Sequence, residues 1–169
     1  MQLPLPTNRH VRARIVNAAL WLAAHNKWCT YSEGAERFSC VHKPYAVPFV
    51  SDCSSGVTDC YSWGGAPDPN KRNYDGQGYT GTLIAEGRLI SARAARASDI
   101  VIFGPGTGWH AALVLEAGAN PLVWSMGEQG DPRIYACSSV AKGVAYVNNV
   151  AECEVRYFRY NTSAWPPPK

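Results

Sequence analysis

Long apolar runs and a strong excess of one charge are both missing from this sequence. No stretch approaches the roughly 18 apolar residues of a membrane-spanning helix. Residues 1–6 also lack the basic segment and apolar core of a secretory signal. We therefore expect a protein that is made in the cytoplasm, carries no signal peptide and does not insert into a membrane. The formal net charge of +3 is too small to indicate nucleic-acid binding.

Cysteine patterns typical of metal and redox centres are missing as well. The six cysteines include no Cys-x-x-Cys pair, which argues against a zinc ribbon or a thioredoxin-type centre. Cys40 and His42 lie near Cys29, but their spacing fits no common zinc pattern. We expect no metal and no cofactor. Cys29 with Cys40, or Cys137 with Cys153, are candidate disulfide pairs, and buried free thiols are an equal alternative for all four.

The composition that remains is typical of one globular domain. A chain of 169 residues with 46% hydrophobic and 17% charged residues is long enough to bury a single core. The last residues include three consecutive prolines, Pro166 to Pro168, which are typical of a semi-rigid linker. We assign residues 1–160 to one domain and residues 161–169 to a proline-rich tail or linker. The chain would then be a monomer, or one module of a longer protein.

Helical patterns occupy the first half of the chain. Apolar residues at helical spacing predict a first helix over residues 8–26. Asp52 is a good N-cap for a second helix, which the Gly64-Gly65 pair ends. A short third helix is expected at residues 81–86, with Thr80 as its N-cap. Between the first two helices, residues 29–51 show no sustained period and indicate an extended segment.

Strand patterns follow in the second half. Apolar runs bounded by turn residues predict five strands, at Ile100–Phe103, Ala111–Leu115, Leu122–Trp124, Val144–Val147 and Cys153–Tyr160. Helices first and a meandering antiparallel sheet afterwards are typical of the α+β class. We therefore predict N-terminal helices packed on an antiparallel sheet of about five or six strands.

Cys53 occupies a position with distinctive chemistry, the first turn of the predicted second helix. The unpaired amide groups and the positive end of the helix dipole stabilise a thiolate there. The same amide groups are available to an oxyanion that forms when the sulfur attacks a carbonyl. A buried structural thiol is the alternative interpretation of Cys53 taken alone.

A thiol nucleophile needs a base, and the chain has four histidines. His10 and His25 lie in or beside the first predicted helix, and His42 lies in the irregular segment. His110 begins a predicted strand directly after a glycine-rich turn, where its side chain can reach over a sheet edge toward a helix N-terminus. A cysteine on a helix followed by a histidine on a strand is the order that papain-like enzymes use.

Three motifs in this order carry a resemblance to a known family. Residues 51–57, Ser-Asp-Cys-Ser-Ser-Gly-Val, resemble the Asp-Cys-Ser-Gly-Phe-Val motif of NlpC-type cell-wall peptidases. Residues 98–103, Ser-Asp-Ile-Val-Ile-Phe, resemble the Gly-Asp-Leu-Val-Phe-Phe strand of that family, and residues 109–114 resemble its His-Val-Gly-Ile-Tyr strand. Residues 74–83 and 121–127 resemble more narrowly the N-terminal peptidase domains of actinobacteriophage endolysins.

The resemblance implies a papain-like fold and a role for each matched residue. Cys53 would attack a carbonyl of the peptidoglycan stem peptide, and its own N–H would contribute to the oxyanion hole. His110 would relay the proton. Asp52 and Ser54, which flank the nucleophile, would bind substrate. Tyr31 is the best match for the tyrosine that faces the oxyanion in this family, and a core or turn aromatic is its alternative interpretation.

The third catalytic residue, which holds the imidazole in its productive orientation, is less clear from the pattern. A hairpin turn centred on residues 119–120 sets Glu128 or Gln129 almost opposite His110, with Ser125 diagonal to it. We favour Glu128, because a carboxylate both orients and stabilises an imidazolium. Gln129 and Ser125 remain alternatives, as does a solvated Glu128 with no catalytic role.

The function implied by the resemblance is a phage-lysin type of peptidoglycan endopeptidase, which acts on the bacterial cell wall. An amidase that uses the same two residues to cut between glycan and peptide is one alternative. A catalytically inactive wall-binding module is another. Its support is Met126, which stands near the place where the family has a polar residue.

Overall fold

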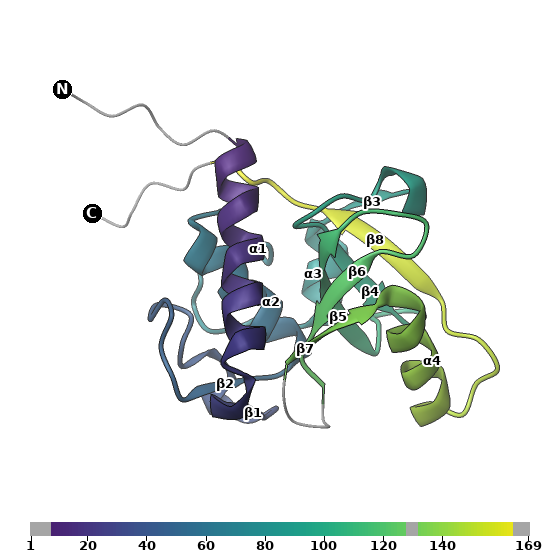
Figure 1. The fold of residues 1–169 in the computed structure, drawn as a ribbon, viewed down its shortest axis with the longest axis horizontal. Helices are drawn as coiled ribbons and strands as arrows, with labels where there is room; N and C mark the ends of the chain where they lie inside the picture. Colours follow the sequence, from purple (N-terminus) through teal and green to yellow (C-terminus); the bar gives the residue numbers. More distant parts are fainter. Residues whose placement is uncertain (1–7, 128–131, 164–169) are drawn as a thin grey trace.

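The computed structural model describes residues 8–127 and 132–163, and we refer only to these below. A helical layer stands on one side of the molecule and a twisted sheet on the other (Figure 1). The helices are α1 (Asn8–Ala24), α2 (Cys53–Gly64), α3 (Thr80–Glu86) and α4 (Cys137–Val147). The strands are β1 (Cys29–Tyr31), β2 (Phe49–Ser51), β3 (Arg88–Ile90), β4 (Ile100–Phe103), β5 (His110–Glu116), β6 (Leu122–Ser125), β7 (Arg133–Ala136) and β8 (Val155–Arg159). Short 3-10 turns lie at Asn26–Trp28, Ala35–Phe38 and Ala92–Ala94.

Six of the strands form one antiparallel sheet in the order β3-β8-β4-β5-β6-β7. The two short strands β1 and β2 pair with each other in parallel, apart from this sheet. Three of the four helices precede most of the sheet in the sequence, and α1 and α2 stand side by side against it (Figure 1). The α+β prediction is therefore confirmed, as is a sheet of about six strands.

The sheet is buried on both faces, and β4 shows why its sequence is apolar throughout. Ile100 and Ile102 belong to the core shared with α1 and α2. Val101 and Phe103 belong to a second core on the opposite face, which includes Cys137 of α4. Because successive side chains of a strand point to opposite faces, a strand covered on both sides needs an unbroken apolar run.

The pairing of α1 with α2 depends on a close backbone contact at Gly64. A Cβ atom built at this glycine would fall 2.4 Å from Ile15 Cγ1 and 2.8 Å from the Ile15 backbone nitrogen. Only a residue without a side chain allows the two helices to approach this closely. The contact sets the end of α2 against the first half of α1, so the start of α2, with Cys53, lies at the far end of the helix pair.

One strand prediction was wrong, at Val144–Val147. These residues form the end of α4, a helix that the sequence reading did not identify. Apolar side chains at positions 137, 140, 141 and 144 recur at helical spacing, and they pack on the second core. Four residues considered alone hide that period, and their β-branched valines then favour a strand.

Smaller differences concern the other elements. The strands β3 and β7 were not predicted, and two short strands lie within the irregular segment before α2. The N-cap of α3 is Tyr79, one residue earlier than expected, and the Thr82 hydroxyl accepts from the Tyr79 N–H at 2.9 Å. None of the described helices is long and apolar enough to cross a membrane.

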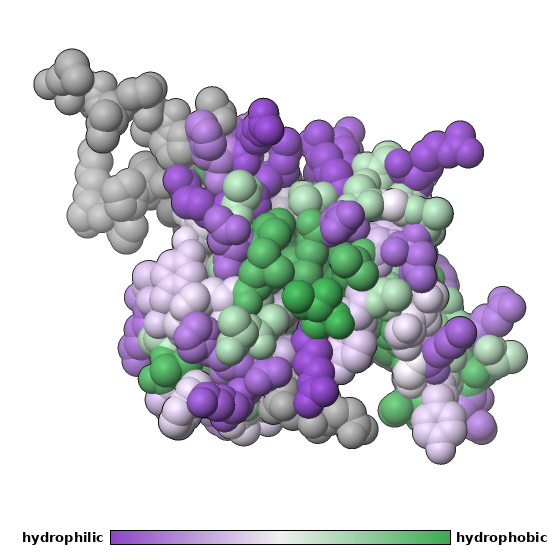
Figure 2. All heavy atoms as spheres, viewed as in Figure 1, coloured by the Kyte–Doolittle hydropathy of each residue, from purple (hydrophilic) through white to green (hydrophobic). Residues whose placement is uncertain are grey.

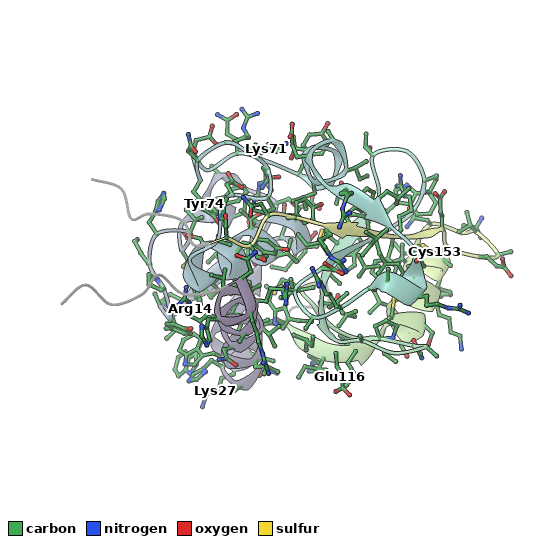
Figure 3. The ribbon with its side chains drawn as sticks, turned by 90° about the horizontal axis from the view of Figure 1, so that it is seen from above. Arg14, Lys27, Lys71, Tyr74, Glu116 and Cys153 are labelled. Atoms are coloured by element: carbon green, nitrogen blue, oxygen red, sulfur yellow. The ribbon has the colours of Figure 1, made fainter. Side chains whose placement is uncertain are left out.

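All six cysteines lie within the described residues, and all six are free thiols. The structure therefore contains neither of the two candidate disulfides and shows the free-thiol alternative. Cys137 is buried within 3.3 Å of the Tyr157 hydroxyl, and Cys153 is half-buried. Figure 3 shows Cys153 near α4, at the end of the molecule away from Arg14 of α1.

Candidate active site

Cys53 is the first residue of α2, and a reciprocal cap holds the start of this helix. The Asp52 carboxylate accepts from the Ser55 N–H at 2.7 Å, and the Ser55 hydroxyl accepts from the Asp52 N–H at 2.9 Å. This capping box confirms Asp52 as the N-cap and fixes the direction in which the helix begins. The Cys53 thiol is 8% exposed.

The parallel pairing of β1 with β2 places Tyr31 beside the nucleophile. Tyr31 is the register partner of Ser51, which lies two residues before Cys53. Burial raises the pKa of the Tyr31 hydroxyl, and the nearby Cys53 raises it further. The hydroxyl donates a hydrogen bond to the Glu33 carboxylate at 3.0 Å. Tyr31 therefore lies near Cys53, and its place facing the oxyanion stays a prediction.

His110 is the first residue of β5, and this strand packs against α2. The backbone N–H groups of Ala111, the next residue, and of Ser54 lie near the Cys53 sulfur and act to lower the pKa of its thiol. The predicted nucleophile at the start of α2 therefore lies near the start of β5, the strand that carries the predicted base.

Ser125 is within hydrogen-bond distance of the imidazole of His110. Its hydroxyl oxygen lies 2.7 Å from His110 Nε2. With Nε2 engaged in this way, Nδ1 is the ring nitrogen left to face a thiol. Glu128, which we favoured, and Gln129, its alternative, lie outside the described residues.

A bulge in the β5–β6 hairpin sets the register that brings Ser125 to His110. Leu113 pairs with Trp124, and the register shifts between Val114 and Glu116. The simple hairpin count assumed no such bulge. Because β5 has one extra residue at the bulge, the residues of β6 beyond the bulge pair one position away from where that count places them.

Close packing behind the site holds Ser125 in place. A Cβ atom at Gly56 of α2 would fall 2.7 Å from the Trp124 ring and 3.0 Å from the Ser51 hydroxyl. The glycine therefore allows the ring of the residue before Ser125 to lie directly on the first turns of α2. This contact links the helix that carries the thiol to the strand that carries the hydroxyl.

Burial opposes charge on both members of the pair. It raises the pKa of the Cys53 thiol to about 12, with a further increase from the Asp52 carboxylate. Burial lowers the pKa of His110 to about 4, although Asp52 acts in the opposite direction. A neutral thiol beside a neutral imidazole is therefore the resting state around pH 7. A proton then moves from sulfur to nitrogen only as the sulfur attacks.

Arg37 contacts the residues that flank Cys53, and the sequence pattern did not point to it. Its guanidinium donates to the Asp52 carboxylate at 2.7 Å, to the Ser54 hydroxyl at 3.4 Å and to the Gly78 carbonyl at 2.6 Å. The side chains of Arg37 and Asp52 are 20% and 11% exposed, so this ion pair is largely shielded from water. The pair balances the Asp52 charge beside the nucleophile.

The same network engages both flanking residues that we expected to bind substrate. The Ser54 hydroxyl donates to Asp52 at 3.0 Å, and both carboxylate oxygens of Asp52 accept from protein donors. In the substrate-free protein these groups therefore hold the site together. No sequence signal identified Arg37, because it lies in the irregular segment, 15 residues before Asp52.

The other histidines serve elsewhere. His25 stacks on Trp21 with ring centroids 3.9 Å apart, and His42 Nε2 lies 3.0 Å from the Tyr74 carbonyl. Among the described residues, no group of three His, Cys, Asp or Glu side chains is arranged to hold a metal ion.

Comparison with known proteins bears on the fold. No protein-family model and no curated protein sequence matches the chain. Among solved structures it is similar to the peptidoglycan hydrolase RipB from Mycobacterium tuberculosis, with a TM-score of 0.52 and 20% sequence identity. The match covers 94% of this chain and 73% of that one. The fold is papain-like. In this chain Cys53 is the first residue of α2, and His110 is the first residue of β5, the strand that packs against that helix.

Proposed function

We propose that this protein is a cysteine peptidase that hydrolyses an amide bond in the stem peptide of bacterial peptidoglycan. The observation that carries the proposal is the position of the Cys53 sulfur. It lies at the start of α2, near the backbone N–H of Ala111, the residue next to His110, which acts to lower the pKa of the thiol. The wall substrate is supported by the NlpC-type motifs and by the similarity to a solved peptidoglycan hydrolase.

The geometry supports a two-step acyl transfer. His110 Nδ1 accepts the thiol proton while the Cys53 sulfur attacks the carbonyl carbon and an S–C bond forms. The backbone N–H of Cys53 stabilises the oxyanion. The imidazolium then donates its proton to the departing amine, the C–N bond breaks, and a thioester remains on the sulfur. Water, deprotonated by His110, hydrolyses the thioester and frees the thiol.

The resting neutral pair suits this sequence of steps. A neutral His110 whose Nε2–H donates to Ser125 has a free lone pair on Nδ1, which is the state that a general base requires. We propose Ser125 as the residue that orients His110 within the described part of the chain. The roles of Asp52 and Ser54 are to hold the start of α2 and, when substrate displaces part of the Arg37 network, to contact the substrate backbone.

The test is digestion of purified peptidoglycan by the wild-type protein and by the Cys53→Ala variant, with the released fragments identified by mass. We expect cleavage within the stem peptide by the wild type and none by the variant. Cys153→Ala is the matched control, because it removes another thiol, which lies near α4, and should leave digestion unchanged. Lysis by a folded Cys53→Ala variant would contradict the proposal.

The same digest separates the alternatives. An amidase would release the stem peptide whole, with L-alanine at its amino end. An inactive wall-binding module would bind the wall and release no fragment, even from the wild-type protein.

A further inference from the structure

A groove lies between α1 and the segment before β4, away from Cys53 and His110. Three arginines line it, Arg9 and Arg12 from α1 and Arg96 from that segment, and its volume is about 360 Å³. The other lining residues are Ala13, Val16, Asn17 and Ala97. None of these described residues is acidic. Hydrophilic side chains gather over this upper end of α1, above an apolar patch at the centre of the same face (Figure 2).

The charge around the groove is strongly unbalanced. The pKa of Arg96 is lowered by partial burial and by the positive charges of Arg12, Arg159 and Arg88. Asp99 acts in the opposite direction, but Arg159 already engages both of its oxygens, at 2.9 and 2.7 Å. Four arginines against one aspartate leave an excess of three positive charges. Such a cluster lowers its own repulsion when an anion binds.

The three guanidinium groups of the groove are also free to bind a ligand. Within residues 8–127 and 132–163, none of them makes a hydrogen bond or ion pair with the protein, whereas Arg14 donates to the Gly64 carbonyl at 2.9 Å. A guanidinium is planar and forms two parallel hydrogen bonds with a carboxylate. The apolar floor excludes water from one side of such a contact.

The groove is separate from the active site. Ala13 and Val16 flank Ile15, the residue that contacts Gly64 at the C-terminal end of α2. Cys53 lies at the other end of that helix. The 12 residues of α2 therefore separate the groove from the nucleophile by roughly 16 Å, at 1.5 Å per residue.

We propose that this α1 groove binds carboxylate groups of peptidoglycan stem peptides at a distance from the bond being cut. The inference rests on the proposed function, because that function makes peptidoglycan the partner. Peptidoglycan repeats its stem peptides, and their free carboxylates, along each strand. One stem peptide in the active site therefore leaves neighbouring carboxylates within reach of the groove, which keeps the protein on the wall between cleavage events.

The test measures sedimentation with purified insoluble peptidoglycan, with Cys53→Ala present in every protein so that the wall stays intact. The groove variant combines Arg9→Gln, Arg12→Gln and Arg96→Gln. Loss of three charge-assisted contacts should weaken binding by about tenfold or more. A charge-matched control combines glutamine substitutions at Lys27, Lys43 and Lys142, which are exposed on other parts of the surface.

Two chemical treatments of the wall identify the ligand. Converting the free carboxylates of the wall to amides should weaken its binding by the Cys53→Ala protein with an unsubstituted groove. The remaining binding should equal that of the groove variant. Removing phosphodiester polymers from the wall should change nothing. Equal binding by the groove variant and the control would overturn the proposal. Binding that is lost only when phosphodiester polymers are removed would overturn the carboxylate assignment.

A further measurement separates this inference from the proposed function. With Cys53 restored, the groove variant should hydrolyse a soluble stem peptide at the wild-type rate, because the groove lies away from the thiol. If the wild-type protein releases no fragment but the groove variant still loses wall binding, then the proposed function fails and the groove stands. If the wild type digests the wall and the groove variant binds normally, then the proposed function stands and the groove proposal fails.

Discussion

At the scale of single residues, the site is built from backbone donors and a short chain of polar side chains. The backbone N–H groups of Ala111 and Ser54 act to lower the pKa of the Cys53 thiol, and Ser125 contacts the ring of His110. Arg37 holds the Asp52 carboxylate, which lies beside both members of the pair. Of these, Cys53, His110 and Asp52 have sequence signatures, Ser125 was one of three alternatives from the hairpin count, and Arg37 had no signature. The partners of a side chain from distant segments depend on register and on loop paths, which a local pattern does not contain.

The contact between Ser125 and His110 predicts a specific kinetic defect. Ser125→Ala should reduce kcat about fivefold while KM changes little, because a lost neutral hydrogen bond is worth about 1 kcal/mol and affects ring orientation rather than substrate binding. Hydrolysis of a soluble stem peptide measures both constants. An unchanged kcat in a folded Ser125→Ala variant would show that another residue, such as Glu128, orients the ring.

The lowered pKa of His110 predicts that kcat/KM falls only at an unusually acidic pH. His110 acts as a base only when neutral, and burial lowers its pKa to about 4, below the ordinary value of 6.5. The imidazole is therefore neutral at every pH above about 5, and kcat/KM should be flat from there to neutrality and fall near pH 4. A pH profile with a stable soluble substrate checks this. Half-maximal activity at pH 6.5 or above would contradict the neutral resting pair.

At the scale of elements, contact between α1 and α2 supports the site from behind. Gly64→Ala forces a methyl group into the Ile15 backbone and should lower the free energy of unfolding by about 1–3 kcal/mol. Gly143→Ala in α4 is the matched control. A Cβ there meets no atom within 4 Å, so alanine should raise stability by about 0.5–1 kcal/mol. Denaturant unfolding compares the two, and equal effects would contradict the packing argument.

The elements also show what the sequence could predict. Capping and helix-breaking residues predicted both ends of α2. Asp52 is its N-cap, and Gly65, in the left-handed conformation, follows its last residue. The apolar run of β4 was recognised because both of its faces are buried. The misassigned Val144–Val147 and the bulge after Val114 were not predictable in the same way, because each depends on which distant surface the segment meets.

At the scale of the whole molecule, one buried carboxyl group reduces the stability of the core. Asp59 of α2 is fully buried, and neither of its oxygens has a hydrogen-bond partner among the described residues. Burial raises its pKa well above 3.8, the neighbouring Asp52 raises it further, and Arg37 lowers it. The folded chain therefore keeps a proton that the unfolded chain releases as the pH rises.

The sign of this linkage gives a prediction for stability. Because the folded-state pKa of Asp59 is raised, its contribution to stability is greatest below about pH 4 and declines as the pH rises toward the folded pKa. The melting-temperature difference between Asp59→Asn and the wild type should therefore grow in favour of the variant from pH 4 to pH 7. The exposed Asp75→Asn serves as the control. A difference that stays constant over this range would contradict the buried, protonated state.

The most direct test of the central claim follows modification and activity in the same sample. Iodoacetamide is added in excess, and at intervals peptide mapping gives the modified fraction of each cysteine while wall digestion gives the remaining activity. The raised pKa of Cys53 makes the reaction slow near pH 7. We predict that activity falls in proportion to modification of Cys53 and is independent of modification at Cys153. Wall digestion that persists after Cys53 is fully modified would contradict the account.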